Sequence, residues 1–182
     1  MSFVRFRSPS AASIPARQHR AYTKAMPIVA MSLFGAIAAP ASADSVSNSV
    51  DVQASPAVVW STIGPFCAIK DWLPPVGSCV EDGNIKPTRT LVTKDGTATF
   101  VELQTARSDA EHFYSYTFLS SPLPVTHYSA TIRVAARYDG GSTVSWMGTY
   151  VPVQGKEKEA KEALTGIYKA GLDQIRASFA ER

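Results

Sequence analysis

Arg89 and Glu102 are the two residues of this sequence whose types and positions most directly suggest chemistry. They lie in two runs of alternating apolar and polar residues, Thr88–Thr93 and Thr97–Gln104, joined by the tight-turn signal Lys94-Asp95-Gly96. The hairpin register points both side chains inward. A buried guanidinium–carboxylate pair either orients a polar group of a ligand or satisfies itself, because desolvation offsets much of its attraction. If the chain is an enzyme, Glu102 and a pocket tyrosine are its acid–base candidates.

Four aromatic residues with a polar tip are expected on inward strand faces: Tyr116, Tyr128, Trp146 and Tyr150. Aromatic residues on a strand face are most often ordinary core. Their hydroxyl and indole N–H groups nevertheless need partners when buried, so several together favour a pocket for a molecule with oxygen atoms. Trp72 is expected to pack under a short helix or to line the entrance of that pocket.

The remaining residue patterns give little support for catalysis. His112 is expected to be exposed at a strand start, and His127 to face outward. No Ser-His-Asp or Cys-His arrangement can be built from them, because a base must lie within hydrogen-bond reach of its nucleophile. The sequence has no cluster with metal-ligand spacing and no glycine-rich phosphate loop. We therefore expect no metal and no cofactor.

Cys67 and Cys79 lie twelve residues apart. In an exported protein an even number of cysteines favours a disulfide, and such a loop would stabilise the fold by roughly 3 kcal/mol. Two buried free thiols and a metal site are the alternatives. Two thiols without a nearby histidine or a third cysteine make a poor zinc site.

Residues 1–43 have the features of a secretory signal peptide. They carry five basic residues and no acidic one, and an apolar stretch, Met26–Ala39, precedes the small residues Ala41-Ser42-Ala43. Cleavage is expected before Asp44; an uncleaved amphipathic anchor is the alternative. The apolar stretch is too short to make a good membrane span. Without the leader, thirteen basic residues face fifteen acidic ones, which disfavours nucleic acid as a partner.

The rest of the chain, residues 44–182, predicts one α+β domain. A strand over Val46–Val52 precedes two short helices, which begin at Ser55-Pro56 and are separated by Gly64-Pro65. Hairpin-forming strands fill most of residues 78–152. Apolar residues spaced by three and four then predict a long helix over Lys156–Phe179. A curved antiparallel sheet of six to seven strands around this C-terminal helix would bury the apolar faces of the sheet and of the helix. The space between them is either filled by side chains or open to a ligand.

A series of short motifs has the order and spacing of a known family. These motifs are Val50-Asp51-Val52-Gln53-Ala54-Ser55-Pro56, Val59-Trp60, Ile63-Gly64-Pro65-Phe66, Asp71-Trp72-Leu73-Pro74, Ser78-Cys79, Arg89-Thr90-Leu91, Asp95-Gly96, Val101-Glu102-Leu103, Tyr114-Ser115-Tyr116, Pro122-Leu123-Pro124-Val125 and Tyr128. Over residues 46–180 the chain resembles the polyketide cyclase/dehydrase and lipid-transport-like branch of the START-like (SRPBCC) superfamily. The resemblance implies a helix-grip fold with a hydrophobic cavity between sheet and helix, used by different members for lipids, hormones, polyketides or small aromatics.

Similarity to the plant abscisic-acid receptors of this superfamily, combined with strand alternation, implies a set of ligand-binding residues. They are Trp72, Arg89, Leu91, Phe100, Glu102, Tyr116, Phe118, Tyr128, Trp146 and Tyr150, with Ala163, Ile167 and Gly171 on the helix. The chain departs from the receptors at their gate loop, which is a tight turn here, and at their cavity lysine, which is Gly77. Leu123-Pro124 replaces their His-Arg latch, so the hormone-receptor mechanism is not supported.

Three functions follow as expectations. The favoured one is a periplasmic or secreted protein that binds a small apolar or amphipathic molecule. The second is a cyclase or dehydratase that uses the same pocket. The third is an accessory protein that docks to another exported protein, as in periplasmic methanol-oxidation accessory members of this superfamily, with a vestigial cavity.

Overall fold

A computed structural model describes residues 42–180 of the chain. The predicted signal peptide, residues 1–43, lies outside the described residues except for its last two positions. Its cleavage and the export of the protein therefore stay predictions.

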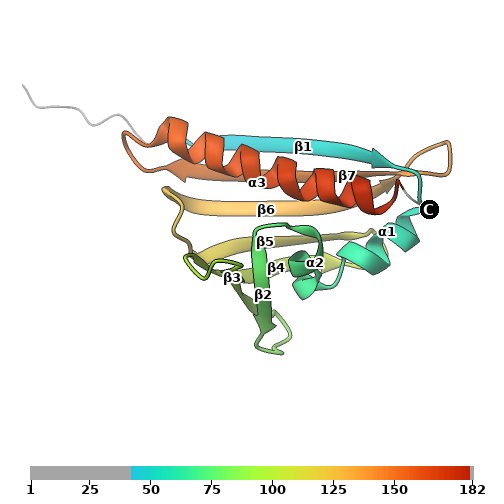
Figure 1. The fold of residues 1–182 in the computed structure, drawn as a ribbon, viewed down its shortest axis with the longest axis horizontal. Coiled ribbons are helices and arrows are strands. Elements are labelled where there is room, and N and C mark those ends of the chain that lie inside the picture. Colours follow the sequence, from blue (N-terminus) through green and yellow to red (C-terminus); the bar gives the residue numbers. More distant parts are fainter. Residues whose placement is uncertain (1–41, 181–182) are drawn as a thin grey trace, which may run out of the picture. The chain divides into compact units, whose positions relative to one another are not determined.

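Seven strands form one antiparallel sheet in the order β1-β7-β6-β5-β4-β3-β2 (Figure 1). Strands β2 to β7 lie side by side in chain order, and β1 pairs with β7 as the edge strand at the other end of the sheet from β2. The predicted curved antiparallel sheet is confirmed. The strands are β1 (Asp44–Val52), β2 (Val76–Glu81), β3 (Thr88–Thr93), β4 (Thr99–Ser108), β5 (Phe113–Ser120), β6 (Val125–Ala136) and β7 (Ser142–Pro152).

Several strand boundaries differ from the sequence expectation by up to four residues, and the structure explains two of these differences. Strand β4 continues to Ser108, four residues beyond its predicted end, because it keeps pairing with β5 past an irregularity between Gln104 and Ala106. Strand β6 ends at Ala136 rather than at Tyr138, because the Arg137 N–H already bonds to the Gly141 carbonyl and begins the turn. The turn leaves the Tyr138 side chain fully exposed.

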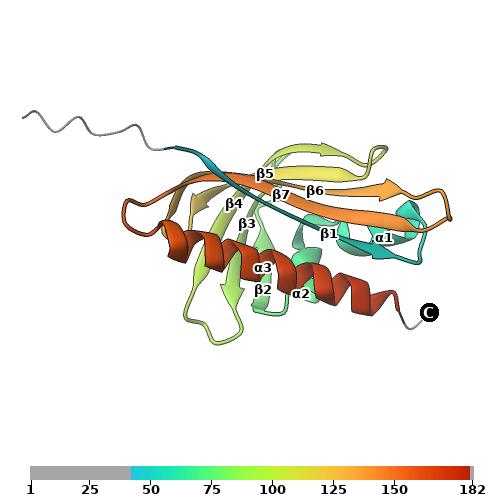
Figure 2. The same ribbon diagram turned by 90° about the horizontal axis from the view of Figure 1, so that it is seen from above.

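The helices follow the signals in the sequence. Helix α1 (Pro56–Ile63) begins with proline in its first turn and ends at Gly64, and η1 (Phe66–Ala68) and α2 (Ile69–Trp72) follow it. The long helix α3 (Glu157–Ser178) lies along one face of the sheet (Figure 2). Its buried residues recur at helical spacing and form one stripe: Ala160, Leu164, Tyr168, Gly171, Leu172 and Ile175.

A disulfide joins the short helices to the sheet. Cys67 in η1 bonds to Cys79 in β2, with the two Cα atoms 5.5 Å apart, as the sequence predicted. No cysteine in the described part of the chain is free, so the alternative of two thiols does not apply to this structure. The loop that the bond closes carries the buried side chains of Ile69, Trp72 and Leu73, and the bond holds these side chains against the sheet.

Stacked aromatic rings fix α3 on the sheet. The Trp146 ring of β7 stacks on the Tyr168 ring of α3, with centroids 4.1 Å apart and planes 10° from parallel. Gly148 makes room for this contact, because a Cβ atom at that position would collide with the Tyr168 hydroxyl. A larger residue at 148 would force the helix and the strand apart.

Two glycine-to-alanine substitutions test this packing. Gly148→Ala is expected to lower the free energy of unfolding by about 1–3 kcal/mol, the usual cost of overpacking. Gly166→Ala is the matched control, because a Cβ atom at that position meets nothing within 4 Å. It should raise the free energy of unfolding by about 0.5–1 kcal/mol, because alanine is a better helix former than glycine. Urea denaturation measures both. A Gly148→Ala protein as stable as the wild type would contradict this account of the packing.

Candidate functional site

A cavity of about 320 Å³ lies between the sheet and α3. Its volume falls at the lower end of the range of about 300–1,000 Å³ found for ligand pockets. Its wall combines side chains from six strands, β2 to β7, from α2 and α3, and from the α2–β2, β3–β4 and β5–β6 connections. Eight of the thirteen predicted ligand-binding residues line it: Leu91, Phe100, Glu102, Tyr116, Phe118, Tyr128, Trp146 and Ile167.

The other five predicted residues lie outside the wall. Trp72 packs edge-on against Trp146, with centroids 5.5 Å apart, and Gly171 lies close to both rings. Arg89 is buried behind Glu102, and Tyr150 is buried opposite Asp44 at the start of β1. Ala163 is half-buried, one position away from Leu164, which points over the cavity.

Nine wall residues were not among the predicted ligand-binding residues: Ile69, Leu73, Pro75, Val76, Thr93, Ala98, Pro122, Leu123 and Leu164. Most of them come from connections and from the short helices, where no strand alternation assigns an inward face. Leu164 belongs to the apolar stripe of α3. The spacing of three and four residues along that stripe was the sequence signal that could have identified it. Thr93 has the strand parity of Arg89 and Leu91, so alternation was an available signal for it, whereas alternation could not have found the residues of α2 and of the connections.

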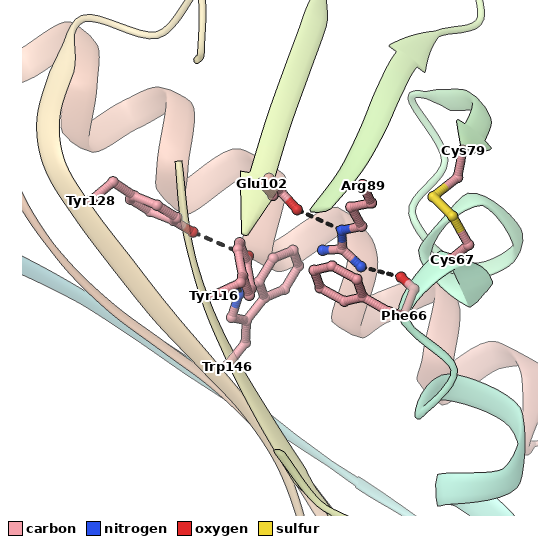
Figure 3. A network of polar contacts seen from close by, with 8 residues as sticks. All are labelled: Phe66, Cys67, Cys79, Arg89, Glu102, Tyr116, Tyr128 and Trp146. Carbon is pink, nitrogen blue, oxygen red and sulfur yellow. Dashed lines mark hydrogen bonds and ion pairs between the residues drawn. A yellow bond between two sulfur atoms is a disulfide. The ribbon is translucent and has the colours of Figure 1, made fainter. Parts of the chain in front are cut away.

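Arg89 and Glu102 form a buried ion pair at one end of the cavity (Figure 3). They are paired directly across β3 and β4, as the hairpin register predicted, and Arg89 Nε donates to Glu102 Oε2 at 2.6 Å. The Arg89 side chain is 0% exposed and Glu102 is 3% exposed. Arg89 Nη1 also donates to the Phe66 carbonyl of η1, and the guanidinium lies 3.9 Å above the Phe66 ring.

Burial and mutual attraction act against each other in this pair. Burial raises the pKa of Glu102 above its ordinary value, and the Arg89 charge limits that rise. Desolvation lowers the pKa of Arg89, but the Glu102 carboxylate more than offsets this effect, so the net pKa shift is upward. A charged Arg89 favours the carboxylate form of Glu102, because otherwise one charge would be buried alone.

A chain of hydrogen bonds joins the aromatic residues of the wall. Trp146 Nε1 donates to the Tyr116 hydroxyl at 3.1 Å, and that hydroxyl lies 3.2 Å from the Tyr128 hydroxyl (Figure 3). The Tyr128 hydroxyl lies 2.7 Å from the hydroxyl of Tyr168 on α3. Desolvation raises the pKa of Tyr116 and Tyr128 well above the ordinary tyrosine value, so both stay protonated at neutral pH. These polar tips satisfy one another inside the protein.

The two described histidines lie away from this site. His112 is half-buried beside Trp60, with ring centroids 5.9 Å apart, and His127 is exposed. Neither lines the cavity. Residues 42–180 contain no group of three or more histidine, cysteine or acidic side chains arranged to hold a metal ion. Within the same range, no helix has the length and apolar character needed to cross a bilayer.

Removing one charge from the buried pair should destabilise the protein more than removing both. Arg89→Met leaves Glu102 buried alone and is expected to cost about 3–5 kcal/mol, whereas Arg89→Met/Glu102→Leu should recover most of that loss. The deficit of the single variant should grow as pH rises above about 4.5, because the folded-state pKa of its unpaired carboxyl is raised further and ionisation then favours the unfolded chain. Urea denaturation between pH 4 and 7 measures this, and a double variant less stable than the single one would refute it.

Comparisons with known proteins place the chain in a family. Residues 43–180 match the family model described as polyketide cyclase / dehydrase and lipid transport. The protein XoxI from Bacillus cereus is 33% identical, with a TM-score of 0.71 over 75% of this chain and 96% of that chain. A protein from Thermobifida fusca is 26% identical, with a TM-score of 0.66 over 74% and 92% of the two chains.

One structural neighbour has an activity in its name. The Zhui aromatase/cyclase from Streptomyces is 19% identical, with a TM-score of 0.62 over 78% of this chain and 96% of that chain, which shows the fold alone. No curated protein is significantly similar to the chain. The match over residues 43–180 and the shared helix-grip fold lead to one conclusion: the chain belongs to the polyketide cyclase / dehydrase and lipid transport family of SRPBCC-type proteins.

Proposed function

We propose that this protein is exported and binds a small hydrophobic or amphipathic molecule in the cavity between sheet and α3. The observation that carries the proposal is the cavity itself, about 320 Å³ with a wall made mostly of aliphatic and aromatic side chains. Burying apolar ligand surface against such a wall is favourable by roughly 25 cal/mol per Å² of area removed from water. The family description, which includes lipid transport, agrees with a binding role.

Binding is favoured over catalysis because almost all polar groups of the wall already have partners. Tyr116 and Tyr128 are engaged with each other and with Trp146 and Tyr168. Glu102 is held by Arg89, and no histidine lines the cavity. Cyclase or dehydratase chemistry needs an acid or base that is free to exchange its proton with the substrate. Glu102 is the remaining candidate for that role.

A cavity-filling substitution tests the binding proposal. Ile167→Trp extends a bulky ring from α3 toward the cavity and should weaken binding of N-phenyl-1-naphthylamine by at least about tenfold, a change of about 1.4 kcal/mol. Gln174→Trp places the same ring on an exposed position of α3 and should leave the affinity unchanged. Fluorescence titration of the probe gives both dissociation constants. Equal affinities in the two variants would contradict binding in this cavity.

Two features support export: the basic, apolar and small-residue order of residues 1–43, and a disulfide of the kind that persists in oxidising compartments. Expression of the full chain in a bacterial host should therefore yield a periplasmic or secreted protein whose sequence begins at Asp44. Cell fractionation and intact-mass measurement determine this. A cytoplasmic protein that retains Met1 would refute export and leave the cavity proposal standing.

A further inference from the structure

Polar side chains are few in the cavity wall, and almost all have partners. The wall contains five residues with a polar side-chain atom: Thr93, Glu102, Tyr116, Tyr128 and Trp146. Four of them are hydrogen-bonded at every donor they possess. Thr93 bonds to the Asp95 carboxylate at 2.6 Å and accepts the Ala98 N–H, and the other three belong to the hydrogen-bonded chain that ends at Tyr168.

Glu102 is the exception. Its Oε2 accepts the bond from Arg89 Nε, while its Oε1 has no hydrogen-bond partner among residues 42–180. Because Glu102 lines the cavity and Oε2 faces Arg89, Oε1 is the carboxylate atom left for the cavity. A carboxylate oxygen can only accept. Oε1 is not among the fully enclosed side-chain atoms of residues 42–180 that lack a partner, so it keeps accessible surface, which the lining of the cavity by Glu102 places on the cavity side. This atom therefore has the chemistry to receive a donor from a bound molecule.

We propose that the cavity selects a neutral, mainly apolar ligand that carries a hydroxyl or N–H group, and that this group donates to Oε1 of Glu102. The inference rests on the proposed function and specifies its ligand class. The rest of the ligand lies against the apolar wall formed by side chains such as Leu91, Phe100 and Leu164.

The charges around Oε1 exclude two other ligand classes. A ligand carboxylate would meet the Glu102 carboxylate and lose its hydration. Arg89 cannot compensate, because it lies outside the wall and its one unpartnered nitrogen, Nη2, is fully buried. A pure hydrocarbon would fill the cavity and leave Oε1 without a donor. A site that hydrogen-bonds a ligand hydroxyl discriminates against an analogue that lacks it, because the buried polar group is then unpaired.

Four naphthalenes of similar shape test the proposal on the wild-type protein: 2-naphthol, 2-methylnaphthalene, 2-methoxynaphthalene and 2-naphthoate. A hydrogen bond to a charged acceptor predicts that 2-naphthol binds about 10- to 100-fold more tightly than each of the other three. Isothermal titration calorimetry or ligand-observed NMR gives the four affinities at neutral pH. Equal affinities for 2-naphthol and 2-methylnaphthalene, or tightest binding of 2-naphthoate, would overturn the ligand class.

Two variants locate the preference at Glu102. Arg89→Met/Glu102→Leu removes the acceptor without leaving a charge buried alone, so it should bind 2-naphthol and 2-methylnaphthalene with equal affinity. Glu81→Gln makes a comparable change at an exposed carboxylate of β2 and should keep the wild-type preference. A double variant that still prefers 2-naphthol would refute the role of Oε1. If none of the four probes binds to the wild type, the proposed binding function fails. If they bind without a preference for 2-naphthol, only the ligand class fails.

Discussion

A single long helix and a few short helical segments cover a seven-stranded sheet, and the difference in width between this long helix and the sheet determines most of the structure. Helix α3 packs mainly on β1 and β7, the two strands at one edge of the sheet. Its one apolar stripe is too narrow to cover the inward faces of β3, β4 and β5 as well. The sheet curves to bring those faces toward the helix, and the space that remains between them is the cavity. The open interior is thus a consequence of covering a wide sheet with one long helix, while the short helices cover only part of the rest.

Aromatic packing sets one boundary of this space. Trp146 stacks on Tyr168 and contacts the edge of Trp72, and Gly148 and Gly171 let these rings approach the backbone closely. The same rings supply the indole N–H and the hydroxyl that begin and end the buried hydrogen-bonded chain. The packed rings of Trp72, Trp146 and Tyr168 therefore fill one end of the interior, while aliphatic residues and Phe100 line the part that stays open.

The sequence predicted the sheet, the long helix, the Cys67–Cys79 bond and the pairing of Arg89 with Glu102, because each depends on a local pattern or on the register of one hairpin. Alternation along a strand tells which side chains face inward. It does not tell how far along the sheet the helix lies, and that distance decides whether an inward residue meets α3 or the cavity. Tyr150 and Tyr128 both face inward, yet only Tyr128 lines the cavity, because β7 carries Tyr150 to the edge beside β1.

The short helices had no such pattern, so their contribution to the wall could not be read from spacing. Two long-range bonds fix them: Arg89 reaches from β3 to the Phe66 carbonyl, and Cys67 is joined to Cys79 of β2. Both act on η1, on the side of the cavity near the edge of the sheet that α3 leaves uncovered. The Arg89 guanidinium thus has two roles, since it holds η1 in place and also balances the carboxylate whose second oxygen faces the cavity. A buried charge pair by itself contributes little net stability, because desolvation offsets its attraction. This pair matters for the cavity because Arg89 links η1 to Glu102, which lines the cavity.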